Sequence, residues 1–188
     1  MASNPKTPVA QATSTKVVTD EVVLGYVKLV TPWSMDPNAE PMYSAMALIR
    51  KTDVKTVAAI QAACQAAAQN GASKYWGGKV PAGLRMPLRD GDTERDGDEY
   101  KGCFFVNARS KQKPRVVDVN RQDILDPDEI YSGAVYRVVL NFYPYNVNGN
   151  RGIGCGLGNV QKIRDGERLG GGSSVEQDFA DTGAEYLA

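Results

Sequence analysis

The amino-acid sequence predicts an all-β protein with one inserted helix, as a five-stranded Greek-key barrel followed by a disordered acidic C-terminal tail. Three observations favour this fold class. Several segments alternate apolar and polar residues with a period of two, as half-buried strands do. Only 53–71 has the composition and the ends of a long helix. A Gly/Ser linker precedes a tail with acids and no Lys or Arg.

The length of 188 residues suits one domain with appendages. Residues 1–20 are rich in Ser, Thr, Pro, Ala and Gln without periodicity, so we expect a flexible N-terminal arm there. The folded domain is expected to span 21–169. Residues 170–188 would form the linker and the acidic tail.

The first two strands are expected at 22–31 and 43–50. The first is a β-branched run that contains Gly25 and ends before Pro32, which cannot donate to a ladder. Trp33 follows this proline, and we expect it in the core.

The single helix is expected at 53–71. Thr52 or Asp53 can cap its first amides, and Gly71 stands where a left-handed C-terminal cap is wanted. Alanine dominates the interior and permits close packing. A narrow apolar stripe indicates that one side packs on the sheet: Val57, Ile60 and Cys64.

Two later strands, at 100–109 and about 134–145, place basic and aromatic side chains on one face. Phe105, Asn107 and Arg109 share the outward face of the first, if Phe104, Val106 and Ala108 face the core. On the second strand the outward set is Arg137, Val139, Asn141 and Tyr143. A base offers a π-face to an aromatic ring and a phosphate to a cation, so these faces suit single-stranded nucleic acid. Half-exposed strands also carry such residues for solubility and cross-strand packing.

The last strand, 151–164, alternates glycine with apolar residues. Gly152, Gly154, Gly156 and Gly158 occupy one face, and Ile153, Cys155 and Leu157 the other. Glycine in a strand indicates strong curvature, or close approach of another backbone or a ligand. Barrel curvature is the simpler of these explanations.

The formal charge of zero hides an asymmetry. Taking the four tail acids away leaves 18 acidic against 22 basic residues, so the body is mildly basic. Such a tail could compete for a basic groove or present aromatic residues to partners. The tail residues in question are Glu176, Asp178, Phe179, Asp181, Glu185 and Tyr186.

Composition excludes several kinds of chemistry. The chain contains no histidine, which removes Ser-His-Asp triads and the commonest zinc ligand. Its three cysteines form no CxxC motif, which favours a reducing compartment. We find neither a membrane-spanning apolar run nor a signal peptide, and therefore expect a cytoplasmic, non-enzymatic protein without cofactor or metal.

Six segments in order resemble the phage-encoded single-stranded DNA-binding proteins with an OB fold. They are KVPAGLRMPLRDG (79–91), YKGCFFVN (100–107), SKQKP (110–114), YSG (131–133), FYPYN (142–146) and VQKIRDGE (160–167). The resemblance runs from about residue 71 to residue 179. It implies an OB-type barrel that coats single-stranded DNA during phage replication and recombination, in the host cytoplasm. A homodimer and replication proteins as tail partners are further expectations.

Strand alternation and charge, rather than the resemblance, supply the candidate DNA contacts. A cationic β-hairpin tip is expected around 110–115, and Lys74–Lys79 form either a stacking clamp or a plug of the barrel. The phosphate contacts would be Lys74, Lys79, Arg109, Lys111, Lys113, Arg115, Arg137 and Arg151. The stacking residues would be Tyr75, Trp76, Phe105 and Tyr143.

Two other functions stay open. Asp90, Asp92 and Asp96 lie in an acidic loop that partly fits calcium-loop spacing, and a metal-dependent nuclease could use them. The twelfth position of that loop is Cys103 rather than Glu, which favours a solvated acidic loop. A phage structural or assembly protein with a β-barrel would explain the strands and the tail, but would give the basic residues no role.

Overall fold

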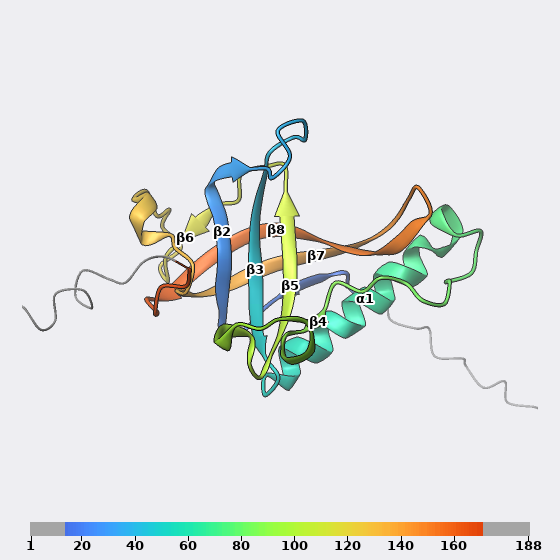
Figure 1. Ribbon diagram of the computed structural model, residues 1–188, viewed down its shortest axis with the longest axis horizontal. Coiled ribbons are helices and arrows are strands. Elements are labelled where there is room, and N and C mark those ends of the chain that lie inside the picture. Colours follow the sequence, from blue (N-terminus) through green and yellow to red (C-terminus); the bar gives the residue numbers. More distant parts are fainter. Residues whose placement is uncertain (1–13, 171–188) are drawn as a thin grey trace, which may run out of the picture.

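The computed structural model describes residues 14–170 (Figure 1). Its strands are β1 (Lys16–Val18), β2 (Val22–Trp33), β3 (Met42–Arg50), β4 (Arg89–Asp90), β5 (Cys103–Ser110), β6 (Val116–Val117), β7 (Val135–Val147) and β8 (Asn150–Arg164). Its helices are α1 (Val54–Tyr75), the short α2 (Gly91–Glu94), and the 3-10 turns η1 (Asp98–Tyr100) and η2 (Pro127–Glu129).

The strands close a barrel. β2, β3, β5, β8 and β7 are neighbours in that order, and β7 pairs back to β2 through Val22 and Tyr136. Four of the five strand pairings in the barrel are antiparallel. The fifth, between β5 and β8, is parallel and pairs Arg109 with Gly156. This is a five-stranded Greek-key barrel of the OB type, so the predicted fold class is confirmed.

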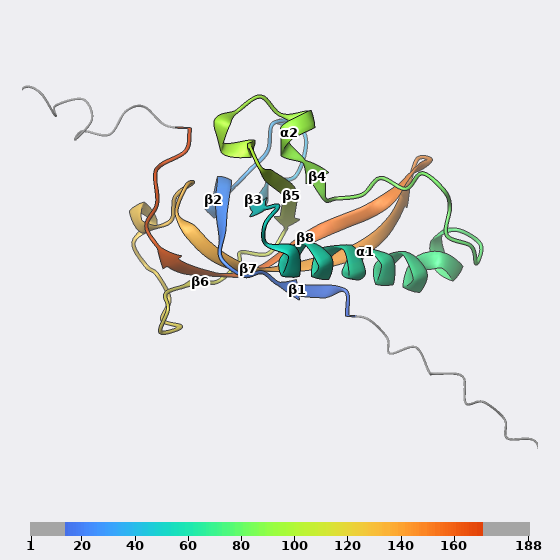
Figure 2. The same ribbon diagram turned by 90° about the horizontal axis from the view of Figure 1, so that it is seen from below.

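The core lies between the barrel strands and α1. Alternating residues of β7 and β8 point inward, and α1 runs beside these strands along the barrel (Figure 2). The largest inward side chains include Leu24, Leu29, Ile49, Ile60, Val106, Tyr136, Val138, Leu140 and Val160. Tyr136 is wholly buried, yet its hydroxyl both donates to and accepts from the backbone of Tyr131, which satisfies the polar atom.

The inserted helix is confirmed, but its predicted C-terminus is wrong. The Asp53 carboxylate accepts from the Thr56 amide at 3.1 Å, as an N-cap should. The helix then continues through Gly71 to Tyr75. A Cβ on Gly71 would stand 2.4 Å from Cγ of Pro144, so this glycine allows α1 to approach β7 rather than ending the helix.

The predicted arm and the predicted burial of Trp33 also need correction. β1 lies inside 1–20, because it pairs with β7 and inserts Val17, only 6% exposed, into the core. Trp33 is 52% exposed, since the register of β2 shifts after Lys28 and its last residues leave the core. The ammonium of Lys28 lies 5.8 Å from the centre of the Trp33 ring.

Candidate nucleic-acid interface

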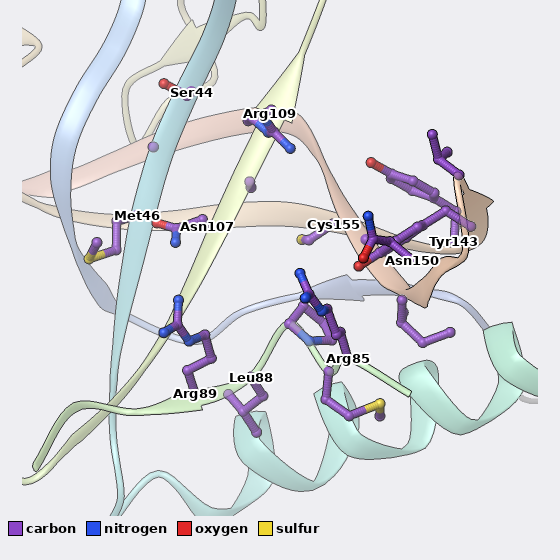
Figure 3. A pocket seen from close by; sticks show the side chains of 18 of the residues that line it. Ser44, Met46, Arg85, Leu88, Arg89, Asn107, Arg109, Tyr143, Asn150 and Cys155 are labelled. Atoms are coloured by element: carbon purple, nitrogen blue, oxygen red, sulfur yellow. The ribbon is translucent and has the colours of Figure 1, made fainter. Parts of the chain in front are cut away.

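A groove of about 1240 Å³ crosses the outer face of the barrel. Its floor is formed by β3 and β5, one wall by the β7–β8 hairpin, and the other by the segment 85–89 (Figure 3). In OB barrels this face, together with the loops at its ends, is the usual oligonucleotide surface. In the described part of the chain three arginines line the groove: Arg85, Arg89 and Arg109. They extend toward the same space in Figure 3.

The floor follows from strand alternation. Ser44 is opposite Arg109 and Met46 is opposite Asn107 in the β3–β5 ladder, so their side chains share one face. Arg109 and Asn107 are exposed, whereas Ala108 between them is buried. The floor therefore offers a cation and an amide beside a methionine. The predicted outward face of Arg109 is confirmed, and its contact with DNA stays a prediction.

The hairpin wall carries an aromatic platform. Tyr143 is 47% exposed and lines the groove. It is opposite Gly154 in the β7–β8 ladder. A Cβ on Gly154 would stand 2.5 Å from Cζ of Tyr143, so the ring packs directly on the glycine backbone. One ring face is thereby held, and the exposed part is available for stacking.

The other wall is a segment that the strand analysis overlooked. The Arg85 amide donates to the Arg151 carbonyl at 3.1 Å, and the Ile153 amide donates to the Arg85 carbonyl at 2.9 Å. A Cβ on Gly152 would meet that same carbonyl at 2.5 Å. The glycines of β8 thus leave room for the Arg85 backbone and for tyrosine rings. This close approach explains the alternating glycines more specifically than barrel curvature does. The segment brings Arg85 and Leu88 to the groove.

Phe105 does not face solvent, and that prediction is wrong. It lies on the expected face of β5, but its exposure is 0%. It belongs to a second small cluster with Met46, Leu48 and Tyr100, and its ring centroid lies 5.7 Å from that of Tyr100. The guanidinium carbons of Arg89 and Arg95 lie 5.1 and 5.3 Å from the ring centre. Phe105 is therefore a support for these arginines, not an accessible stacking ring.

The expected cationic hairpin at 110–115 is also absent, because β6 pairs in parallel with β8 and not with β5. Two of its cations have acidic partners. The ammonium of Lys111 lies 2.7 Å from a Glu40 carboxylate oxygen. The Arg115 guanidinium donates to both carboxylate oxygens of Asp123, at 3.0 and 3.1 Å. Lys113 and Arg115 line a smaller apolar pocket beside β2, not the groove.

The remaining candidate contacts lie elsewhere. Lys74 to Lys79 lie at the C-terminal end of α1, where Trp76 packs against the main core and the Lys74 ammonium lies 5.3 Å from the Tyr75 ring centre. This favours the plug over the stacking clamp for Trp76. Arg137 is exposed but donates from Nε to the Thr19 carbonyl at 3.2 Å. Neither Arg137 nor Arg151 lines the groove.

Two of the three acids proposed for metal chemistry, Asp90 and Asp92, form ion pairs within the fold. The Lys51 ammonium donates to Asp90 and to Asp92, at 2.7 Å each. The Lys51 contact and the Gly102 amide lower the pKa of Asp92, and the hydrogen bonds to Asp90 and Asp92 raise the pKa of Lys51. In residues 14–170 no cluster of three or more acidic or cysteine ligands could hold a metal ion.

Some expectations fall outside the described residues. The tail residues Glu176, Asp178, Phe179, Asp181, Glu185 and Tyr186 all belong to 171–188. Within 14–170 no helix has the length and apolarity needed to cross a membrane.

Comparison with known proteins gives consistent results. A family model described as Enterobacter phage Enc34, ssDNA-binding protein, matches residues 15–186. The putative protein p50 of Acyrthosiphon pisum secondary endosymbiont phage 1 is 29% identical over 177 residues, 88% of this chain and 93% of that protein.

Two solved structures show the same fold. The single-stranded DNA-binding protein from bacteriophage Enc34, in complex with ssDNA, has a TM-score of 0.72 and 24% identity, covering 82% of this chain and 89% of that one. The gp2.5 single-stranded DNA-binding protein of bacteriophage T7 has a TM-score of 0.60 and 17% identity, covering 89% and 93%. The chain belongs to the family of the Enterobacter phage Enc34 ssDNA-binding protein.

Proposed function

We propose that this protein binds single-stranded DNA with little sequence preference, in the groove over β3 and β5. Membership of a phage ssDNA-binding family supports this function. The observation that carries the assignment to the groove is the Tyr143 ring, packed on Gly154 and 47% exposed beside Arg85 and Arg109. Stacking on such a ring tolerates any base, and cations along the groove attract phosphates.

The groove carries residues for both tasks. Tyr143 and the apolar side chains of Met86 and Leu88 suit the flat faces of bases. Arg85 and Arg109 suit phosphates, since a guanidinium can donate two hydrogen bonds to one phosphate. A duplex hides its base faces in its own stack, so this groove favours single strands.

The test is binding of the full-length protein to a labelled oligo(dT), compared with a duplex of equal length, over a series of salt concentrations. We expect the single strand to bind more tightly, with a logarithmic salt slope of about −0.7 for each phosphate contacted. Equal affinity for both forms, or a slope near zero, would contradict the proposal.

For the acidic tail we propose two roles: competition with DNA for basic residues, and presentation of Phe179 and Tyr186 to replication proteins. A segment tethered by a short Gly/Ser linker reaches millimolar effective concentration. Removing the residues after Leu169 should therefore tighten oligo(dT) binding, most strongly at low salt. Weaker binding of the truncated protein would show that the tail contributes contacts or folding energy instead.

We further propose that the protein is a binding protein without enzymatic activity, acting where phage replication and recombination expose single strands. The pairing of Asp90 and Asp92 with Lys51 supports this against the nuclease. Incubation of labelled single strands with magnesium and protein is expected to leave them intact. Degradation that Asp92→Ala abolishes would establish the nuclease.

A further inference from the structure

Of the acids within residues 14–170, Glu94 alone lines the groove. It ends the short helix α2 and accepts from Nε of Arg89 at 2.6 Å, with a second contact from Nη2 of Arg89 to the same oxygen. Both side chains remain partly exposed, at 44% for Arg89 and 36% for Glu94. An arginine that faces the groove is therefore already occupied by an internal carboxylate.

The position of Arg89 is fixed by Phe105. Its Cα is paired with that of Phe105 in the β4–β5 ladder, and its guanidinium carbon lies 5.1 Å from the Phe105 ring centre. Because Phe105 is wholly buried, the ring is a rigid support. Stacking of this kind leaves the edge of the guanidinium free to donate, and here that edge meets Glu94.

The backbone of Glu94 is fixed by the loop that carries it. Asp90 caps α2 by accepting from the Asp92 amide at 3.0 Å, and Lys51 joins both carboxylates to the barrel. Gly91 permits this tight fold, since a Cβ there would stand 2.6 Å from the Tyr100 carbonyl oxygen. The loop thus holds the backbone of Glu94 beside Arg89, while the partly exposed Glu94 side chain is free to turn toward solvent.

We propose that Glu94 is an internal competitor for DNA phosphate, which holds Arg89 in its binding position and limits the affinity of the groove. A phosphate that enters takes the place of the carboxylate on the edge of Arg89. The inference rests on the proposed function and deepens it, because it assigns one residue the task of keeping binding reversible. A carboxylate and a phosphate present equivalent acceptor oxygens to a guanidinium, so the exchange needs no rearrangement of Arg89.

The experiment compares Glu94→Gln with the wild-type protein in oligo(dT) binding at low and high salt. Losing the acid should tighten binding about fivefold at low salt, the effect of one unit charge close to a phosphate in water. The logarithmic salt slope should become steeper by about 0.7, as for one more phosphate contact. At 1 M salt the gain should vanish, since the screening length falls to about 3 Å.

Asp98→Asn is the matched control. Asp98 lies in the same loop region, is 90% exposed, pairs with Lys101 and does not line the groove. Asp98→Asn changes the net charge by the same amount as Glu94→Gln, but at a site outside the groove. The affinity of this variant for oligo(dT) should therefore stay within about twofold of wild type. The double variant Arg89→Ala/Glu94→Gln should bind no more tightly than Arg89→Ala alone.

The outcomes separate two hypotheses. Wild-type protein that fails to bind oligo(dT) at low salt contradicts the proposed function itself. Wild-type protein that binds while Glu94→Gln binds equally or more weakly overturns only the role of Glu94. An equal gain from Asp98→Asn also overturns it, because the effect would then be general charge repulsion.

Discussion

Phe105 on β5 and Tyr143 on β7 stand on the outer side of the same barrel, and their sequence patterns are alike. Phe105 is fully buried beside Tyr100, Arg89 and Arg95, whereas Tyr143 rests on a glycine and is 47% exposed. The difference arises from the neighbouring segments rather than from the strands. Alternation determines on which side of the sheet a side chain lies. The segments between the strands, such as residues 89–100, decide whether that side is exposed to solvent.

The largest expected effect is on stability. Phe105→Ala should lower the free energy of unfolding by about 3–5 kcal/mol, because it empties a closely packed position under Tyr100 and two arginines. Urea denaturation measures this value. A loss below about 1 kcal/mol would mean that the residues over β5 do not pack on Phe105, and that its ring is exposed to solvent as that of Tyr143 is.

The next effect is on binding. Tyr143→Ala should weaken oligo(dT) binding by about 1–3 kcal/mol, roughly 5- to 150-fold, with a small change in stability, because it removes one stacking ring. Fluorescence anisotropy measures the affinity. Tyr75→Ala, at the end of α1 and outside the groove, is the aromatic control and should leave affinity almost unchanged. A larger loss from Tyr75→Ala would move the stacking site to the α1 end.

A subtler change tests how Tyr143 is held. Gly154→Ala places a methyl group 2.5 Å from Cζ of Tyr143, so the ring must move and binding should weaken by about 1 kcal/mol. Gly156→Ala is the control on the same strand, since its Cβ would meet the nearest atom at 3.4 Å. If both substitutions weakened binding equally, the effect would come from any added side chain on β8 and not from displacement of the Tyr143 ring.

The smallest effect concerns single cations. Arg109→Ala should make the salt slope shallower by about 0.7, the value for one lost phosphate contact. Arg115→Ala should leave the slope unchanged, because Asp123 already binds that guanidinium through two hydrogen bonds. Salt titrations of both variants provide the comparison, and a shallower slope for Arg115→Ala would extend the DNA path to the 110–115 loop.

Much of the fold could be predicted from local patterns. Period-two alternation located β5 and β7 and their inward residues, and the Asp53 cap located the start of α1. The end of α1 could not be predicted. Gly71 is the residue type that commonly caps a helix, but here it lies inside the helix and allows close contact with Pro144. That distinction depends on a tertiary approach that no local pattern contains.

The site was less predictable for the same reason. Arg109 and Tyr143 follow from alternation. Arg85, in contrast, reaches the groove through backbone hydrogen bonds to β8, and Arg89 through the pairing of β4 with β5. The cations at 111–115 were misleading, since Lys111 pairs with Glu40 from a distant part of the sequence and Arg115 pairs with Asp123, eight residues further on. The alternating glycines were a local signal of this wall, since close approach was one of their two explanations, although barrel curvature was preferred.

The central claim is that single-stranded DNA lies over β3 and β5 with a base against Tyr143. Photocrosslinking of an oligonucleotide containing 5-iodo-deoxyuridine, followed by mass spectrometry of the crosslinked peptide, tests it directly. The account predicts a crosslink at Tyr143. Crosslinking confined to Trp33 or to Tyr75 and Trp76 would contradict it, because the strand would then pass outside the groove.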